Sequence, residues 1–129
     1  MANLISTTID GGLYTQGEGT VTTQSGTTVA IDLATGNSFE ITMDNISGSI
    51  TTFTISNLGG AGYISYFTLH VTQAATARDF AWGGLSAFKW SGGTAPTMTS
   101  TDNKIDIYSF TTWDNGTTWY GRIIGQNYS

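Results

Sequence analysis

Cysteine is absent from the chain, and histidine occurs only once, at His70. The first absence excludes disulfides, thiolate metal sites and cysteine nucleophiles. The second leaves no pair of histidines to share a metal ion, and a lone histidine is more often structural than functional. No run of apolar residues approaches the length of about 20 that a membrane-spanning helix needs. The packing of the chain therefore has to stabilise its fold.

Charge is scarce as well. Asp, Glu, Lys and Arg make up 10% of the chain, against about 25% in a typical globular protein. Nine acidic residues stand against four basic ones, which makes nucleic acid an implausible partner. The first residues lack the basic segment of a secretory signal, so we expect neither secretion nor membrane insertion. A weakly charged surface lowers the solubility of a free monomer, so this composition favours a protein whose surface is covered within an assembly.

Apolar residues recur at every second position, in β-forming residue types and between Gly, Asn, Asp and Ser turn signals. No segment has the periodicity of a helix, so no helix is available to connect parallel strands. The pattern predicts an all-β fold, an antiparallel β-sandwich of jelly-roll type. The expected strands are Thr20–Thr23, Val29–Leu33, Ser38–Asp44, Thr51–Ser56, Tyr63–Thr72, Lys104–Trp113 and Thr117–Gly125, with shorter pieces near Arg78–Trp82 and Ala87–Trp90.

We expect the chain to divide into a short arm and one domain. Residues 1–17 end in a glycine-rich, aperiodic stretch and are interpreted as an extended N-terminal arm that a neighbour orders. Residues 18–129 form the β-sandwich domain, which has an ordinary size for a single core. The alternation of apolar residues assigns these side chains to the core: Phe39, Ile41, Met43, Tyr63, Phe67, Leu69 and Val71.

The last hairpin is the most informative segment. Its Asn115-Gly116 pair favours a two-residue type I′ turn, because both central residues of that turn need positive φ. This turn sets three cross-strand pairs on one face: Thr112 with Trp119, Phe110 with Gly121, and Tyr108 with Ile123. The opposite face is then also largely apolar, with Ser109 and Arg122 between its apolar residues, which are Ile105, Ile107, Trp113, Tyr120 and Ile124.

A small sandwich buries one face of each sheet and leaves the other to water, so a second apolar face needs a cover. Self-association is the favoured interpretation, because most soluble oligomers are symmetric homo-oligomers. The five apolar residues of the opposite face are then interface residues. The alternative is that the arm of residues 1–17, or the segment from Ala74 to Thr101, folds back over this face.

Two short segments resemble each other, Phe80-Ala81-Trp82-Gly83-Gly84 and Phe88-Lys89-Trp90-Ser91-Gly92-Gly93. A tryptophan followed by glycines can form a flat stacking platform for a sugar, and tryptophan is also frequent in protein interfaces. The third interpretation is that Trp82 and Trp90 pack against the open ends of the sandwich. Both remain candidate ligand or interface aromatics beside that packing role.

The sequence does not indicate catalysis. A glycosidase needs two carboxylates in contrasting environments across a cleft, whereas Asp79, Asp102, Asp106 and Asp114 sit beside turns or alternate with apolar strand residues, as solvated carboxylates do. His70 has no serine at a recognisable spacing to activate. Calcium-loop and phosphate-loop patterns are also absent from the sequence. We therefore expect no enzyme, no cofactor and no metal site.

One long part of the chain resembles a known family. It comprises Phe88-Lys89-Trp90-Ser91-Gly92-Gly93-Thr94-Ala95-Pro96-Thr97-Met98-Thr99, Asn103-Lys104-Ile105-Asp106-Ile107-Tyr108-Ser109-Phe110 and Thr118-Trp119-Tyr120-Gly121, with Gly36–Thr42 and Val71–Gln73 upstream. Over about residues 30–125 the chain is similar to a domain of tailed-phage virion structural proteins, which recurs at the ends of tail fibres and in small virion proteins. The resemblance implies an all-β sandwich that commonly forms trimers.

Fibre proteins are long chains with this domain at one end, whereas the present sequence adds only a short arm to it. The resemblance therefore favours a homotrimeric capsid decoration, or cement, protein, made in the host cytoplasm and bound to the virion surface. Its partners would be further copies of itself and the major capsid protein, with the arm lying across the shell. The alternative is a distal tail-fibre or spike knob that binds a host-surface glycan through Trp82, Trp90 or other exposed aromatics. A polysaccharide-cleaving enzyme is the rival from a different class.

Overall fold

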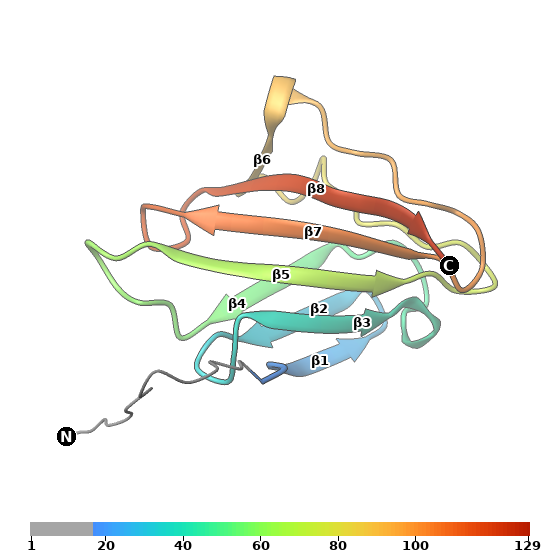
Figure 1. Cartoon of the computed structure of the whole chain (residues 1–129), viewed down its shortest axis with the longest axis horizontal. Coiled ribbons are helices and arrows are strands. Elements are labelled where there is room, and N and C mark those ends of the chain that lie inside the picture. Colours follow the sequence, from blue (N-terminus) through green and yellow to red (C-terminus); the bar gives the residue numbers. More distant parts are fainter. Residues whose placement is uncertain (1–16) are drawn as a thin grey trace, which may run out of the picture.

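The computed structural model describes residues 17–129, which form eight strands in two sheets (Figure 1). One sheet has three strands in the order β1-β2-β4, and the other has five in the order β3-β5-β7-β8-β6. The strands are β1 (Thr20–Ser25), β2 (Thr28–Asp32), β3 (Ser38–Thr42), β4 (Thr52–Ser56), β5 (Ser65–Thr72), β6 (Phe88–Trp90), β7 (Ile105–Thr112) and β8 (Trp119–Tyr128). Two 3₁₀ turns, η1 (Met43–Asn45) and η2 (Ser91–Gly93), follow β3 and β6.

The predicted all-β sandwich is confirmed. All seven long predicted strands are present, with ends that differ from the prediction by a few residues. The predicted short piece Ala87–Trp90 corresponds to β6. The other short piece, near Arg78–Trp82, is not a strand and forms a single bridge between Phe80 and Ile50.

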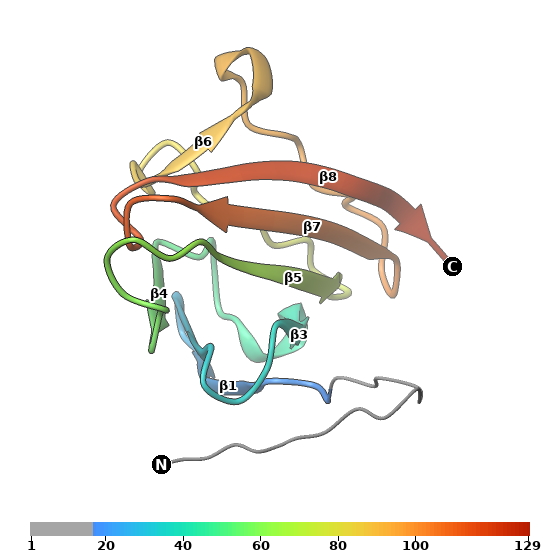
Figure 2. The ribbon, with the colours of Figure 1, turned by 60° about the vertical axis from the view of Figure 1, so that its left-hand side comes forward.

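The strand pairing is mixed, whereas antiparallel pairing was predicted. β2 with β4, β3 with β5, and β6 with β8 are parallel. The prediction assumed that parallel neighbours need a connecting helix. Here the chain changes sheet at each step from β2 to β5, so β3 connects the parallel strands β2 and β4 through the opposite sheet, and β4 does the same for β3 and β5 (Figure 2).

The core lies between the two sheets and is mainly aromatic. Phe67 and Phe110, which are register partners on β5 and β7, stack with ring centroids 4.9 Å apart. The Trp119 ring meets the Phe67 ring edge-on at 5.1 Å. Phe53 of the opposite sheet lies 6.0 Å from the Phe67 ring. Each such pair contributes about 0.5–1.5 kcal/mol beyond the area that it buries. The contact between Phe53 and Phe67 joins the two sheets.

Most of the side chains that the alternation assigned to the core are buried: Phe39, Ile41, Met43, Phe67, Leu69 and Val71. Tyr63 is the exception, because its side chain is 67% exposed. β5 begins only at Ser65, whose hydroxyl accepts a hydrogen bond from the Gly59 amide at 3.0 Å. The residues before Ser65 form a loop, so the alternation of the strand does not extend back to Tyr63.

The β7–β8 hairpin has the predicted turn residues in the predicted conformation. Asn115 and Gly116 both have positive φ, 56° and 87°, which is the requirement of a type I′ turn. The Thr117 amide donates to the Asp114 carbonyl across the turn at 3.4 Å. Two of the predicted cross-strand pairs are register partners in the structure: Phe110 with Gly121, and Tyr108 with Ile123.

Beyond Tyr108 the hairpin becomes irregular. Two register shifts give the pairs Ile107 with Gly125 and Ile105 with Tyr128. Such shifts are the mark of β-bulges, which bend a strand and increase its twist. Ile123, predicted on the core side with Tyr108, is 43% exposed. The edge strand β6 pairs with β8 only as far as Gly121, so it does not cover the part of β8 that follows.

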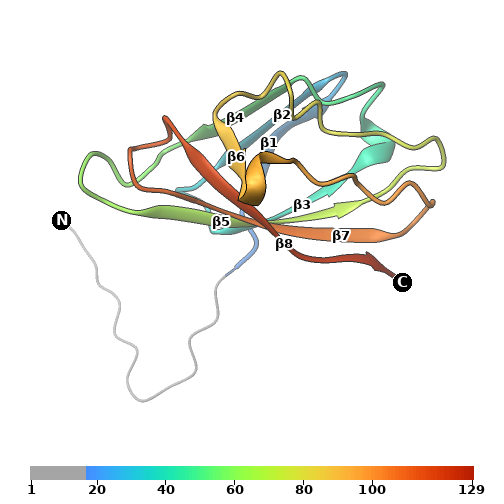
Figure 3. The ribbon, with the colours of Figure 1, turned by 90° about the horizontal axis from the view of Figure 1, so that it is seen from above.

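The long segment between β5 and β7 closes one open side of the sandwich. It buries Phe80, Trp82, Leu85 and Met98 in the core. Figure 3 shows it on the side of the five-stranded sheet that faces β1, β2 and β4. The segment from Ala74 to Thr101 therefore does not cover the outer face of that sheet. Residues 1–16 of the predicted N-terminal arm lie outside the described residues.

Candidate functional site

The exposed large hydrophobic side chains of residues 17–129 lie on or next to three neighbouring strands of the five-stranded sheet. They lie just before and within β5, at the end of β7 and along β8: Tyr63, Ile64, Tyr66, Trp113, Tyr120, Ile123, Ile124 and Tyr128. Three of the five predicted interface residues, Trp113, Tyr120 and Ile124, belong to this set. The other two, Ile105 and Ile107, are half-buried and alternate with core residues on β7. The structure thus leaves the predicted residues accessible along two neighbouring strands.

The outer face of the five-stranded sheet, which points away from β1, β2 and β4, has an aromatic end and an aliphatic end. A row of polar register partners crosses the sheet between them: Ser38, Thr68, Ser109 and Arg122. Tyr66 and Tyr120 lie on one side of this polar row, and Ile107 lies on the other. The single apolar face that was predicted is therefore divided into two apolar patches, one aromatic and one aliphatic.

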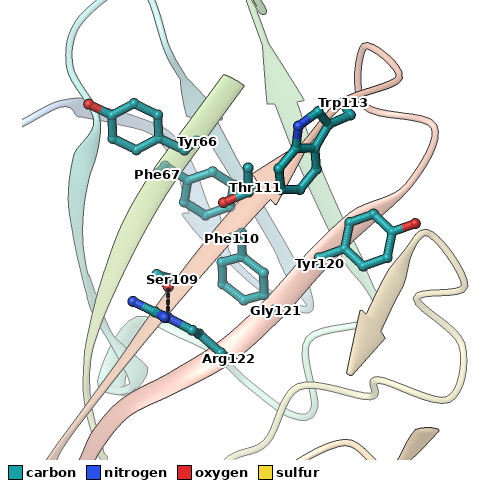
Figure 4. A pocket seen from close by; sticks show the side chains of 9 residues that line it. All are labelled: Tyr66, Phe67, Ser109, Phe110, Thr111, Trp113, Tyr120, Gly121 and Arg122. Atoms are coloured by element: carbon teal, nitrogen blue, oxygen red, sulfur yellow. Dashed lines mark hydrogen bonds between the residues drawn. The ribbon is translucent and has the colours of Figure 1, made fainter. Parts of the chain in front are cut away.

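The aromatic end contains a groove of about 490 Å³ over β5, β7 and β8 (Figure 4). Tyr66 stands on one side of it and Tyr120 on the other, with Thr111 of β7 between them in register. Trp113 extends the second wall, and its ring meets Tyr120 at 5.8 Å and 69°. The short side chains of Ser109 and Thr111 lie on the strand between these walls. The outer-face groove thus combines exposed aromatic rings with small hydroxyl groups.

Arg122 lines the same groove from β8. Its Nε donates to the Ser109 hydroxyl at 3.2 Å, which lays the guanidinium group over β7. Within residues 17–129 the single ion pair is His70 with Glu40, at 3.9 Å between Nδ1 and Oε2. Arg122 is thus a cation that no carboxylate of the described chain neutralises. His70 itself is half-buried beside Glu40, which is compatible with the structural role expected for it.

Trp82 and Trp90 pack against one another and against the core. Trp82 is 8% exposed, stacks on Phe80 with ring centroids 4.5 Å apart, and meets Trp90 edge-on at 4.9 Å. Trp90 is half-buried and also contacts Phe110 at 5.6 Å. A stacking platform needs an exposed ring face, which Trp82 does not offer. Three exposed aromatic rings lie instead in the outer-face groove, on Trp113 and Tyr120, which the sequence assigned to self-association, and on Tyr66, which it did not assign to a site.

Asp106 is the centre of a buried polar network and not the solvated carboxylate that was expected. Its Oδ2 accepts hydrogen bonds from the Thr99 amide (2.8 Å), the Tyr108 hydroxyl (3.0 Å) and the Gln126 side chain (2.9 Å). Its Oδ1 accepts one from the Asn127 amide at 3.0 Å. Burial raises the pKa of Asp106, but the hydrogen bonds from Thr99, Asn127 and Gln126 outweigh it and hold that pKa below its usual value.

The sequence did contain a signal for the burial of Asp106. Asp106 alternates with Ile105 and Ile107 and therefore shares a face of β7 with Tyr108, which the hairpin register assigned to the core. Burial is the main cause that raises the pKa of Tyr108, and the negative charge of Asp106 raises it further. The Tyr108 hydroxyl therefore keeps its proton and donates a hydrogen bond to Asp106. The network joins β7, β8 and the segment before β7, which is a structural role.

The other acidic candidates do not form a catalytic pair. Asp114 is a turn residue: its Oδ1 accepts from the Thr118 amide at 2.8 Å and from the Thr112 hydroxyl at 2.9 Å, and the first of these bonds is the main cause that lowers its pKa. Burial raises the pKa of Asp79, and Asp102 is exposed in the turn before β7. None of these three lines the outer-face groove.

In residues 17–129, no three His, Asp or Glu side chains come together as metal ligands. Over the same part of the chain, no helix has the length and apolar character to span a membrane.

Comparison of the chain with family models, with curated proteins and with solved structures finds no match in any of the three. The function therefore has to be argued from the surface of the domain itself. That surface has two apolar patches on the outer face, a groove in one of them and the cation Arg122 at the side of the groove.

Proposed function

We propose that the chain is a virion structural protein, a homotrimeric capsid decoration protein that binds the assembled phage shell and stabilises it. The observation that supports this most is the concentration of exposed large hydrophobic side chains on β5, β7 and β8. A monomeric protein seldom leaves large apolar patches open to water, and such patches mark protein interaction sites. The function is therefore the binding of protein surfaces, with no catalytic role.

Self-association is assigned to the aliphatic end of the outer face. Ile105 and Ile107 of β7 and Ile124 of β8 form its centre, and Trp113 and Tyr120 border it across the polar row. Burying one aliphatic side chain of this size contributes about 1.5–3 kcal/mol if it was fully exposed before. The low charge of the chain, 10% of residues, also reduces the repulsion between identical copies.

The partner beyond the trimer is the major capsid protein. A protein that binds only the assembled shell stabilises it by mass action, because every bound copy lowers the free energy of the assembled state. A trimer presents each contact three times, which increases its effective affinity for a repeating surface. The N-terminal residues 1–16 are assigned to the same attachment.

The first test is the mass of the purified protein in solution, measured by light scattering after size-exclusion chromatography. We expect a species of three times the 13.7 kDa chain mass. Ile107→Ser and Ile124→Ser should lower the mass to that of one chain and leave the circular dichroism spectrum unchanged. Ile64→Ser is the matched control, because Ile64 is exposed but lies outside the aliphatic end. A monodisperse monomer at high concentration would contradict the proposal.

The second test is attachment to phage particles. Purified protein should sediment with undecorated shells at hundreds of copies per particle, a number that the tail cannot provide. Deletion of residues 1–16 should leave the domain folded and reduce this occupancy. Occupancy of only a few copies would indicate the tail, and unchanged occupancy after the deletion would remove the N-terminal segment from the attachment.

A further inference from the structure

The outer-face groove has the properties of a ligand site, and the trimer proposal uses only Trp113 and Tyr120 of its lining, at the border of the self-association surface. Its volume of about 490 Å³ falls within the range of small-molecule pockets, roughly 300–1,000 Å³. Such pockets are lined by aromatic side chains with a few polar groups that orient the ligand. The groove lies at the aromatic end of the outer face, across the polar row from Ile105 and Ile107.

Aromatic side chains border the groove on both sides, with the Tyr66 and Tyr120 rings turned away from each other (Figure 4). Tyr66 and Tyr120 lie on either side of Thr111, on strands that are separated by one strand. Two strand spacings place their backbones roughly 10 Å apart. A single sugar ring can therefore lie over Thr111, between these two strands. Trp113 extends one wall, with its ring edge-on to Tyr120 at 5.8 Å.

The polar groups of the groove favour a carboxylate. Arg122 has no carboxylate partner in the part of the chain that the structure describes, and its Nε bond to Ser109 uses only one of its five N–H donors. The guanidinium fork matches a carboxylate in two parallel hydrogen bonds. The hydroxyls of Ser109 and Thr111 add donors and acceptors for the rim of a polar ring. The groove thus offers apolar faces, hydroxyl partners and one positive charge.

An extended peptide is a poorer occupant of this site. β7 lies between β5 and β8, and β6 pairs with β8 as far as Gly121, so most of the backbone beneath the groove has paired neighbours on both sides. A bound peptide could not add a strand there, which is the main source of affinity in that mode of recognition. A nucleic acid presents a row of phosphates, whereas Arg122 is the single cation that lines the groove.

We propose that the outer-face groove binds a pyranose sugar that carries a carboxylate. Its ring lies over Thr111 beside the Tyr120 and Trp113 rings, with Tyr66 at the opposite border of the groove, its carboxylate pairs with Arg122, and its hydroxyls bond Ser109 and Thr111. Uronic acids of polysaccharides and sialic acids of glycoconjugates share this chemistry, and the test distinguishes them. Binding here would attach the domain to a polysaccharide surface while its aliphatic end remains available to other copies.

The experiment titrates the full-length protein, in whatever oligomeric state it has, with trigalacturonate and with 3′-sialyllactose. Binding is followed by isothermal calorimetry and by the chemical shift of the Trp113 indole N–H in NMR spectra. The neutral counterparts are the methyl ester of trigalacturonate and lactose. We expect one of the two acidic probes to bind and its neutral counterpart to bind at least about tenfold more weakly, because a charge-assisted pair is lost.

Variants then assign the binding to the groove. Arg122→Gln should reduce affinity for the acidic probe at least about tenfold and leave the weak affinity for the neutral one unchanged. Tyr66→Ala and Tyr120→Ala should weaken both. Tyr63→Ala is the matched control, because Tyr63 is an exposed tyrosine that does not line the groove. It should bind like the unchanged protein.

Three results would overturn the proposal. The first is no binding of either acidic probe at millimolar concentrations. The second is equal affinity for an acidic probe and its neutral counterpart, or binding that persists in Arg122→Gln. The third is that Tyr66→Ala and Tyr120→Ala dissociate the trimer without affecting sugar binding, which would assign the groove to a second copy of the chain. Each is distinguishable from failure of the trimer proposal, which depends on the mass alone.

Discussion

Replacing Asp106 by asparagine tests the buried network that joins β7 to the end of β8. The asparagine carbonyl oxygen can take the place of Oδ2 and accept from the three donors that reach it, from Thr99, Tyr108 and Gln126. Its NH₂ group then faces the amide N–H of Asn127, which has donated to Oδ1, so that bond is lost. The substitution keeps the size of the side chain and changes only the charge and one acceptor.

The expected cost follows from those four bonds. A hydrogen bond to a charged group contributes about 1.5–3 kcal/mol and a neutral one about 0.5–1.5 kcal/mol, so the three altered bonds lose roughly 3 kcal/mol together. The bond from Asn127 adds about 1 kcal/mol to the loss. Removing a buried charge returns part of this, because the charge no longer has to be desolvated. The net loss in the free energy of unfolding is about 2–3 kcal/mol at pH 7.

The loss should depend on pH in a defined direction. The pKa of Asp106 in the folded protein lies below its ordinary value of 3.8. A carboxylate with a lowered pKa stabilises the fold fully above the unfolded value, and this stabilisation disappears as the pH falls through the folded value. The difference in the free energy of unfolding between wild type and Asp106→Asn should therefore have its full size at neutral pH and disappear in strong acid.

Urea unfolding followed by tryptophan fluorescence measures this gap at a series of pH values. Asp102→Asn is the control, because Asp102 is exposed and the same change of charge should leave stability nearly unaltered. Equal stability of wild type and Asp106→Asn at neutral pH would refute the reasoning. So would a gap that stays constant into strong acid, since the charge of Asp106 could not then be its cause.

Three further substitutions test the packing, each by urea unfolding. Phe110→Ala removes a fully buried ring and should cost about 3–5 kcal/mol; a cost below about 1 kcal/mol would contradict its place in the core. Gly121→Ala brings a Cβ to 2.8 Å from Phe110 and 2.9 Å from Trp90, and should cost about 1–3 kcal/mol. Gly116→Ala forces an L side chain to a φ of 87° and to 2.8 Å from Leu58, and should cost about 1–2 kcal/mol. Unchanged midpoints for the two glycine variants would show that the strands shift to admit a methyl group.

Much of the local structure could be predicted because its causes are local. The strand periodicity placed Phe39, Ile41 and Phe67 in the core correctly, since neighbouring residues of a strand point to opposite faces. The Asn115-Gly116 pair predicted its turn, since few residues adopt positive φ without strain. Tyr63 was misplaced because a pattern of apolar residues does not show where a strand begins.

The candidate site was predicted only in part. Trp113 and Tyr120 were placed correctly on an exposed face of the hairpin. Tyr66, the opposite wall of the groove, lies some 50 residues earlier in the sequence, and its place depends on the pairing of β5 with β7. Trp82 and Trp90, the aromatic candidates that the glycine-rich loops suggested, pack into and beside the core because their segment closes the side of the sandwich.

The sequence by itself determined that this protein is an all-β sandwich, which residues of most strands face the core, and where the last hairpin turns. These properties depend on side-chain periodicity and on the φ preferences of single residues. Only the tertiary structure decided that β2 and β4, and β3 and β5, run parallel, that the buried Asp106 accepts four hydrogen bonds, and that Tyr66 and Arg122 line one groove. Such properties depend on contacts between residues far apart in the chain, whose free energies exist only once the sheets have packed.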